Sequence, residues 1–523
     1  MSGNIQNPIG GLWLKRFAGL GDSVFLPVQS GINSRRKTVF DEKSGQRYEL
    51  YQAINCPDNT PQAHLAFYLR HEIPDLAFLY QIFNTLGGDF VQDWINREPT
   101  GQYARRVAFL YEWLTGEELT VPSNLNGNYI DALDSKKVLT ADKDKTVKNS
   151  RWRVNNNLAG NRYFCPTIIK TPSFEQAISL DIDYLIKELN NEFGEDLLAR
   201  SSVYLTLGES RASFQIEGEG QATSRIQRFA EVIARHTGQG DLPIFPKRLS
   251  ELQQAILGDK TLLSDFGLRQ SPVFIGQSFL SDEVVHYIAP VDRLSERLNG
   301  LQDFWNKTTT QSPVLRCAVL AFGFVYIHPL ADGNGRLHRF LLNDSLHRDG
   351  VLPNNMILPF SSTITQSAAE RKRYADILET ISKPLMQHIQ GFYNFDKQRK
   401  IYADGIRSNL IFEDTTLAEP FWRYPNLTPH IEYISALIKT VVEHNMREQS
   451  QYLQKHEQTR EKLKELAEMP NDYADRIIRS ICENKGQLSN KLIKEFDFLK
   501  DNQDLWQRMI TVVKTAFEDK SNS

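Results

Sequence analysis

The twelve residues His328-Pro-Leu-Ala-Asp-Gly-Asn-Gly-Arg-Leu-His-Arg339 lie between two stretches with helical patterns, and they decide the fold around them. Residues 314–326 are apolar on most faces, which predicts a buried helix. Pro329 and Gly333 end that helix, and a second helical pattern begins near Arg336. The sequence therefore predicts a buried helix, a glycine-rich loop and the start of another helix in direct succession.

This loop has the features of an anion-binding site. Unpaired backbone N–H groups at the start of a helix attract negative charge, and Gly333 and Gly335 let the backbone approach an anion closely. Arg336 and Arg339 are three residues apart and share one face of the new helix, where two guanidinium groups suit a polyphosphate. Asp332 offers a hard oxygen ligand for Mg²⁺ held jointly with phosphate oxygens.

His328 stands at the entrance of the loop, and because an unperturbed histidine titrates close to neutral pH, it is the candidate general base. The alternative is a capped helix–loop–helix turn that carries two surface arginines. We expect His338 and His347, on the helix after the loop, to lie on its surface.

Length and composition bound the class of protein. At about 100–200 residues per domain, 523 residues predict about three domains. The chain is 41% hydrophobic and 24% charged with a net charge of −3, which excludes collagenous, mucin-like and wholly disordered chains and argues against a dedicated polyanion-binding protein. The four cysteines are isolated, as is typical of a reducing compartment. Without a signal-peptide pattern or a stretch of about 20 apolar residues, we expect a soluble cytoplasmic protein with no membrane partner.

The pattern along the chain suggests where its parts divide. Residues 1–135 suggest mixed helix and loop, with the clearest helix at 100–114, and residues 134–150 suggest an exposed loop. The runs VFIG and VVHYIAP within 272–290 predict a β-hairpin inside a helical region. Residues 430–468 predict one long helix or two helices broken near Met446.

The segment from His328 to Arg339 resembles the signature of the Fic family, His-Pro-Phe-x-(Asp/Glu)-Gly-Asn-Gly-Arg-x-x-Arg, and differs only at Leu330, where the family usually has Phe. The hairpin upstream resembles the family's flap and lies between Arg269 and Pro290. The resemblance implies a mainly α fold with a Fic-type helical core and a β-hairpin flap at residues 173–400. An N-terminal helical domain at 1–172 and a C-terminal helical domain at 401–523 would flank this core.

The resemblance also implies an activity, protein adenylyl transfer, in which AMP passes from ATP to a Ser, Thr or Tyr hydroxyl of a target protein docked at the flap, including the enzyme itself. His328 would deprotonate the hydroxyl, and Asp332 would hold Mg²⁺ or Mn²⁺. Asn334 would orient the α-phosphate. Arg336 would contact the β-phosphate side, and Arg339 would contact the γ-phosphate.

Two further parts of the nucleotide site follow from the same resemblance. The backbone amides of the loop around Gly333 and Gly335 would cradle the phosphates. Tyr374 occupies roughly the place where relatives have a tyrosine in the adenine pocket, and a tyrosine of the hydrophobic core is the alternative.

A second motif, Ser213-Phe-Gln-Ile-Glu217-Gly218, resembles the family's inhibitory pattern (Ser/Thr)-x-x-x-Glu-(Gly/Asn) and lies N-terminal to the flap. It implies that Glu217 pairs with Arg339 and occupies the place of the γ-phosphate, so that ATP binds in a pose that does not react. The alternative is an ordinary helix residue.

Two rival functions are compatible with the same motifs. Glu217 could position a water that removes AMP from a modified protein, or the loop could sense nucleotide in a regulatory protein without catalysis. Residues 472–517 could form a helix-turn-helix, but acidic and basic residues are mixed there, so we do not expect a nucleic-acid partner. The sequence has no GxxxxGK[ST] and no HExxH, and it leaves a homodimer open.

Overall fold

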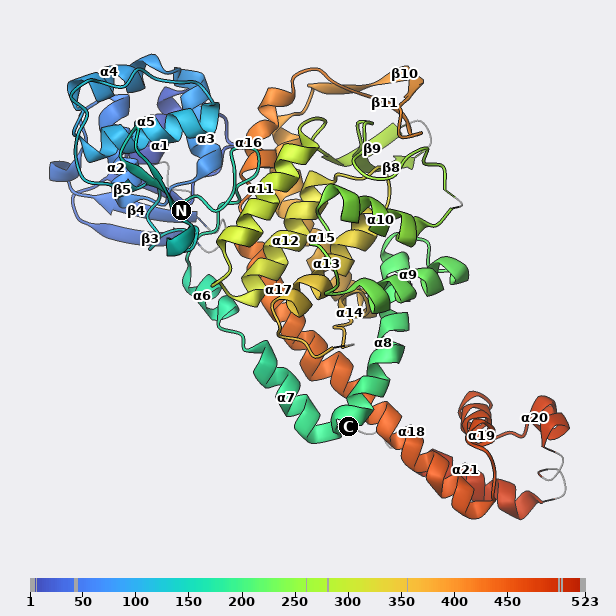
Figure 1. Ribbon diagram of the computed structural model, residues 1–523. Helices are drawn as coiled ribbons and strands as arrows, with labels where there is room; N and C mark the ends of the chain where they lie inside the picture. The colour runs from blue at the N-terminus through green and yellow to red at the C-terminus, as the bar shows by residue number, and fades with distance from the viewer. Residues whose placement is uncertain are drawn as a thin grey trace. The chain divides into compact units, whose positions relative to one another are not determined.

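The computed structural model describes residues 5, 7–41, 46–259, 261–279, 282–354, 356–496, 499 and 502–517. The fold is mainly α, as the sequence predicted, with only small sheets (Figure 1). The chain forms two compact units. The first comprises Met1–Leu180, Ser210–Val351 and Phe360–Leu437, and the second comprises Asp181–Glu209, Leu352–Pro359 and Ile438–Ser523.

The N-terminal part of the first unit combines six helices with two small sheets within its described residues. The helices are α1 (Gly10–Phe17), α2 (Pro61–His71), α3 (Leu76–Leu86), α4 (Asp89–Arg97), α5 (Gln102–Thr115) and α6 (Pro172–Ile178). The strands are β1 (Pro8–Ile9), β2 (Val28–Ile32), β3 (Lys37–Asp41) and β4 (Gln46–Tyr51) in the order β1-β2-β4-β3, and β5 (Ile130–Asp131), β6 (Val147–Asn149) and β7 (Val154–Asn156) in the order β5-β7-β6.

The prediction of helix and loop alone for this region was wrong, because the region also contains these two sheets. Their strands have two to six residues, too few for the alternation of apolar and polar residues to stand out. The helix predicted at 100–114 is α5, which begins at Gln102 after Gly101 as N-cap and ends before Gly116 in the left-handed conformation.

The rest of the first unit carries the glycine-rich loop and the hairpin. Its helices are α9 (Thr223–His236), α10 (Pro246–Leu257), α11 (Leu294–Lys307), α12 (Pro313–Ile327), α13 (Asn334–Arg348), α14 (Phe360–Gln366), α15 (Ala368–His388), α16 (Glu419–Arg423) and α17 (Thr428–Thr440). Two antiparallel hairpins accompany them, β8 (Phe274–Phe279) with β9 (Asp282–Ile288), as predicted, and β10 (Tyr393–Ile401) with β11 (Arg407–Phe412), which the sequence analysis did not predict.

Helices α12 and α13 form the centre of this region and pack against each other (Figure 1). Every residue of α12 from Val314 to Ile327 is buried, as its apolar sequence predicted. Even so, none of the helices among the described residues has both the length and the apolar character needed to cross a membrane.

The second unit is built from helices. They are α7 (Ile182–Phe193), the first part of α8 (Glu195–Ile216), α18 (Arg447–Leu466), α19 (Asn471–Glu483), α20 (Asn490–Glu495) and α21 (Gln503–Phe517). Apolar residues of α18, α19 and α21 form its core. The predicted pattern at 430–468 is α17 and α18 joined by a π-helical stretch, Val441–Met446, so the irregularity lies where the sequence suggested.

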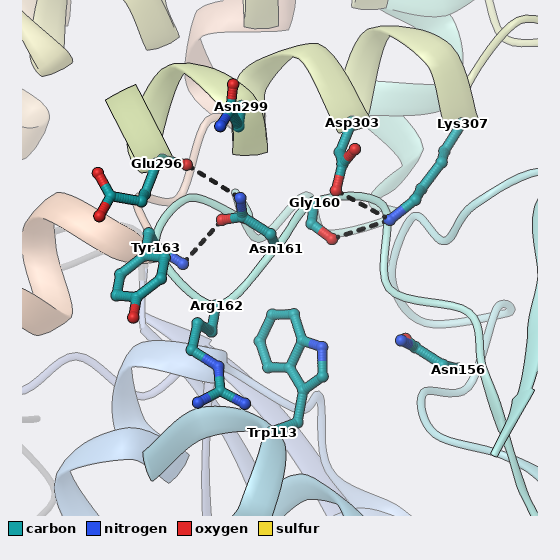
Figure 2. Close-up of a pocket in the computed structure, with 10 residues that line it drawn as sticks. All are labelled: Trp113, Asn156, Gly160, Asn161, Arg162, Tyr163, Glu296, Asn299, Asp303 and Lys307. Atoms are coloured by element: carbon teal, nitrogen blue, oxygen red, sulfur yellow. Dashed lines mark hydrogen bonds and ion pairs between the residues drawn. The ribbon is translucent and has the colours of Figure 1, made fainter. Parts of the chain in front are cut away.

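A polar pocket of about 520 Å³ lies where the segment around Asn161 crosses α11, and Figure 2 shows the residues that line it. The Asn161 amide donates to the carbonyl of Glu296 at 2.9 Å, and the Lys307 ammonium donates to the carbonyl of Gly160 at 3.1 Å. The crossing is close because α11 has a glycine here. A Cβ on Gly300 would lie 2.6 Å from the carbonyl oxygen of Phe164.

We expect Gly300→Ala to destabilise the protein by about 1–3 kcal/mol, because the added methyl group meets a backbone carbonyl that cannot move aside. Helix propensity alone predicts the opposite sign, since Ala is favoured over Gly by about 1 kcal/mol inside a helix. Thermal unfolding distinguishes the two, with Gly21→Ala as control because a Cβ there has no neighbour closer than 4.0 Å. An unchanged or higher Tm for Gly300→Ala would show that the crossing is looser than described.

Candidate active site

His328 ends α12 in an uncommon conformation. Its backbone has φ 49° and ψ 56°, in the left-handed region that residues other than glycine rarely adopt. The backbone N–H of His328 donates to the carbonyl of Phe324, and Nδ1 lies 3.2 Å from the carbonyl oxygen of Val325. Because a carbonyl oxygen can only accept, Nδ1 carries the proton in this contact, and Nε2 keeps a lone pair that can take a proton from a substrate.

The surroundings keep this imidazole neutral. Burial and, second, the positive charge of Arg269 lower the pKa of His328 to about 4, and the contact with the Val325 carbonyl opposes this shift only in part. At neutral pH the side chain is therefore a base with a free nitrogen.

The loop that follows is shaped by buried polar contacts. Leu330 is fully buried, so leucine fills the core position where the signature has Phe. The amide of Asn334 accepts from the Leu330 N–H at 2.9 Å and donates to its carbonyl at 2.7 Å, which leaves one N–H of the amide for a ligand. Gly333 turns the chain into α13 with φ 92°.

Gln253 on α10 supports the loop from outside the motif. It is buried, donates to the carbonyl of Asp332 at 3.0 Å and accepts from the N–H of Gly267 at 2.7 Å. Gln253 lies 79 residues before Asp332, and no local sequence pattern marks it as part of the site.

The space above Gly335 holds an anion supplied by the chain itself. A Cβ at Gly335 would lie 2.6 Å from Oε1 of Glu217 and 3.1 Å from Nη1 of Arg339, so only glycine leaves room for both groups. Arg339 Nη2 donates to Oε1 of Glu217 at 2.6 Å, and Arg336 Nε forms an ion pair with Oε2 at 2.9 Å. The two arginines that the sequence placed on one helix face thus bind one carboxylate from a segment about 120 residues away.

Ser213 completes this contact. Arg339 Nε donates to the Ser213 hydroxyl at 2.7 Å, and Nη2 donates to its carbonyl at 3.1 Å. Arg339 is 3% exposed and Ser213 is fully buried. The guanidinium is therefore fixed on both sides before any ligand binds.

The end of α8 sets the position of the Glu217 carboxylate. The helix stops at Ile216, and Gly218 adopts the left-handed conformation with φ 77°. The N–H of Gly218 donates to the carbonyl of Gln215, and the N–H of Glu219 donates to the carbonyl of Phe214. This is the pattern of a helix that ends at a glycine. Glu217 is thus the first residue after the helix, with its side chain 24% exposed.

Asp332 lies at the open side of the loop. Its side chain is 53% exposed and forms an ion pair with Arg336 at 3.0 Å. Among the described residues, no three carboxylate, histidine or cysteine side chains are close enough to hold a metal ion by themselves. A single exposed carboxylate beside a phosphate cradle fits a hard divalent cation that takes its other ligands from phosphate oxygens and water.

His338 corrects one expectation. It is fully buried, and its Nδ1 lies 2.8 Å from the carbonyl oxygen of Ala321. Its ring centroid is 4.9 Å from that of Phe322, and burial lowers its pKa to about 3. The expected surface position was wrong because α13 is buried on nearly all faces, whereas a polar sequence usually indicates a solvated face. His347 is half-buried.

A second cavity, of about 630 Å³, lies beside the turn at His328. It is lined by the hairpin, by the last turn of α12 and by one face of α15, with Ile275, Val285, Tyr326, Ala375, Leu378 and Met386 among its residues. Tyr374 is not among them. It is a buried residue that lies 6.2 Å from the His338 ring, centroid to centroid, and it lies close enough to Arg339 for that charge to act on its hydroxyl.

Comparison with known proteins gives matches in this region. A sequence model described as Fic/DOC family matches residues 246–346. The protein adenylyltransferase fic-1 of Caenorhabditis elegans is 32% identical over 110 residues, or 21% of this chain and 20% of that protein. A protein adenylyltransferase Fic of Drosophila willistoni is 30% identical over 120 residues, or 23% and 22%. This chain thus spans about a fifth of the length of these relatives.

Two more similarities extend the comparison. A Fido domain-containing protein of Dictyostelium discoideum is 36% identical over 86 residues, which are 16% of this chain and 54% of that protein. The alignment with a crystal structure of a Fic family protein from Desulfovibrio desulfuricans G20 covers 65% of this chain and 90% of that protein's chain, with 18% sequence identity and a TM-score of 0.37. Residues 246–346, which contain the hairpin and the signature loop, therefore match the Fic/DOC family.

Proposed function

We propose that this chain is an autoinhibited protein adenylyltransferase, which transfers AMP from ATP to a Ser, Thr or Tyr hydroxyl of a protein. One observation supports this above the others. The Glu217 carboxylate lies in an anion site formed over Gly335 by Arg336 and Arg339, at the start of the helix that follows His328. A site that holds a carboxylate by two guanidinium groups has the chemistry to hold a phosphate.

In the proposed reaction the phosphates lie along the loop, with Arg336 and Arg339 on the β- and γ-phosphates and the free amide N–H of Asn334 on the α-phosphate. Nε2 of His328 accepts the proton of the target hydroxyl. The hydroxyl oxygen forms a bond to the α-phosphorus, the bond from that phosphorus to the bridging oxygen breaks, and pyrophosphate leaves. The protein contributes mainly positioning and charge neutralisation, as is general in phosphoryl transfer.

Asp332 would hold Mg²⁺ or Mn²⁺, which neutralises phosphate charge when bound. To do so its carboxylate would share or leave the ion pair with Arg336. The loop carbonyls stay in place during this change, because Gln253 and Asn334 hold them through buried hydrogen bonds.

The adenosine and the target have separate places in this proposal. The cavity beside the last turn of α12 is large enough for a nucleoside and mostly apolar in its lining, and it adjoins the flap. Tyr374 does not line this cavity and would act only through the neighbouring Arg339. The target docks along the flap, where Val284, which does not line that cavity, is 52% exposed and a peptide can add as a further strand.

Inhibition follows from the geometry of the anion site. The Glu217 carboxylate and the γ-phosphate are both negative and would compete for Arg339. While Glu217 is in place, ATP binds only with its phosphates displaced from the line of attack, and the reaction is slow.

We expect Glu217→Gly to raise the rate of adenylyl transfer, including self-modification, by about tenfold or more. A tenfold gain means that the Glu217 carboxylate, by competing with the γ-phosphate for Arg339, costs the reaction about 1.4 kcal/mol of free energy. Incorporation of labelled AMP into the protein and into lysate proteins measures it. Glu219→Gly is the matched control, since that exposed carboxylate pairs with Arg225 outside the anion site. No gain over wild type would contradict inhibition by Glu217, and release of AMP from a modified protein by wild type alone would favour the reverse reaction.

We expect His328→Ala, made together with Glu217→Gly, to lower the transfer rate by about 10²–10⁴-fold, the usual contribution of a general base. ATP binding should change little, because His328 contributes no charge to the phosphate site. Calorimetric titration with ATP and the transfer assay measure the two properties on the same samples. A transfer rate close to that of the parent variant would exclude His328 as the base.

The pH dependence gives a further test in the Glu217→Gly variant. The base must be neutral to act, and the pKa of His328 is lowered to about 4, so kcat/KM should fall less than about twofold between pH 8 and pH 5.5. A histidine with its ordinary pKa near 6.5 would lose about tenfold over the same range. A tenfold loss would therefore show that the surroundings of His328 do not depress its pKa as described.

A further inference from the structure

Arg269 joins the two ends of the flap to the turn that carries His328. Its guanidinium donates from Nε to the carbonyl of His328 at 2.7 Å, from Nη1 to the carbonyl of Ser271 at 2.7 Å, and from Nη2 to the carbonyl of Pro290. Ser271 precedes strand β8 and Pro290 follows strand β9, so both roots of the hairpin and the base turn share one side chain. Arg269 is 5% exposed, and all three acceptors are backbone groups.

The backbone reinforces this junction. The N–H of Arg269 donates to the carbonyl of Pro329 at 2.9 Å, and Leu268 pairs with Leu330 as an isolated antiparallel bridge. The chain just before the flap therefore runs along the chain just after His328.

The β10–β11 turn fixes the same root from the other side. The carboxylate of Asp404 accepts from the N–H of Gln270 at 2.8 Å, from the N–H of Ser271 at 2.9 Å and from the Ser271 hydroxyl at 2.8 Å. Tyr287 of β9 donates its hydroxyl to the carbonyl of Tyr326, two residues before His328, at 2.6 Å. The flap is thus tied to the end of α12 at several points, and Arg269 is the one that contacts His328.

The conformation of His328 explains why such a contact is needed. A histidine with φ 49° persists only where its surroundings hold it. The bond from Arg269 fixes its carbonyl, and the orientation of that carbonyl fixes the direction in which the side chain leaves the turn.

Only arginine supplies this set of contacts. Its planar guanidinium directs donors to three separate carbonyls at once, whereas the ammonium of a lysine is a compact charge on one nitrogen and cannot reach three separate carbonyls. The positive charge also acts on the imidazole, since it lowers the pKa of His328 after burial does. Arg269 in turn faces Asp404, Tyr287 and Arg297, and burial lowers its own pKa to about 10, so it stays charged at neutral pH.

We propose that Arg269 is a positioning residue for the transfer reaction, which orients His328 and links it to the flap so that a protein docked on the flap is held in fixed register with the base. This inference rests on the proposed function for the role of His328. It predicts that Arg269 affects kcat with the protein target more than it affects ATP binding.

The test uses the full chain with Glu217→Gly as the active parent and adds Arg269→Lys or Arg269→Gln. We expect kcat for transfer to fall about 10- to 100-fold in both, while the KM for ATP stays within about twofold, as for loss of an interaction that acts in the transition state. Arg373→Gln is the matched control, because that guanidinium is 68% exposed on α15. A kcat within twofold of the parent in a folded Arg269→Lys protein, judged by its Tm, would overturn the proposal.

The pH profile separates positioning from a purely structural role. Arg269→Gln removes the positive charge that faces His328 while Asp404, Tyr287 and Arg297 remain, so the pKa of His328 should rise and the acid limb of the kcat profile should move to higher pH. Arg269→Lys keeps the charge, so its acid limb should stay in place although kcat falls. The same displacement in both variants, or in neither, would contradict the proposal.

A measurement without activity keeps this inference distinct from the proposed function. NMR titration of ¹³C-labelled histidines, with the His328 signal assigned by its loss in His328→Ala, should show a higher pKa for His328 in Arg269→Gln than in the unmodified protein. If the Glu217→Gly parent transfers no AMP, the proposed function fails, yet this shift still decides whether Arg269 acts on His328. An unchanged titration would exclude that action.

Discussion

The ion pair of Glu217 with Arg339 and Arg336 is the interaction on which the rest of the site depends. It brings the end of α8 against the first turn of α13 and needs a glycine at 335 to leave room. Both arginines are almost fully buried, and without a carboxylate or a phosphate above Gly335 the charge of Arg339 would lack this anionic partner, while Arg336 would keep only the ion pair with Asp332. In the proposed function, the same need of two buried guanidinium groups for an anion would both stabilise the inhibited protein and create its affinity for a polyphosphate.

The scaffold around this pair is rigid where the chemistry requires it. Helices α12 and α13 lie in the core, and the loop between them is held by the amide of Asn334, by Gln253 and by the contact of Arg269 with His328. The parts exposed to solvent are the carboxylate of Asp332 and the outer residues of the flap, where a metal ion and a protein target would enter. Fixed backbone and exposed ligand groups are what a positioning mechanism needs.

Much of this could be predicted because it is local. The helix–loop–helix order around residues 328–339 follows from adjacent apolar, glycine and arginine positions. The burial of His338 was mispredicted because polarity in a helix suggests solvent. The roles of Gln253 and Arg269 could not be predicted, since Gln253 contacts Asp332 and Arg269 contacts His328 through backbone carbonyls distant in sequence, and such contacts leave no pattern of residue types.

The central claim is that the Glu217 carboxylate occupies the place of the γ-phosphate. Calorimetric titration of wild type and Glu217→Gly with ATP and with ADP tests it most directly, because the two nucleotides differ by that phosphate alone. The account predicts that wild type binds ATP no more tightly than ADP. It predicts that the variant binds ATP at least about tenfold more tightly than it binds ADP, a difference of about 1.4 kcal/mol in binding free energy. The same ratio of ATP to ADP affinity in both proteins would contradict it.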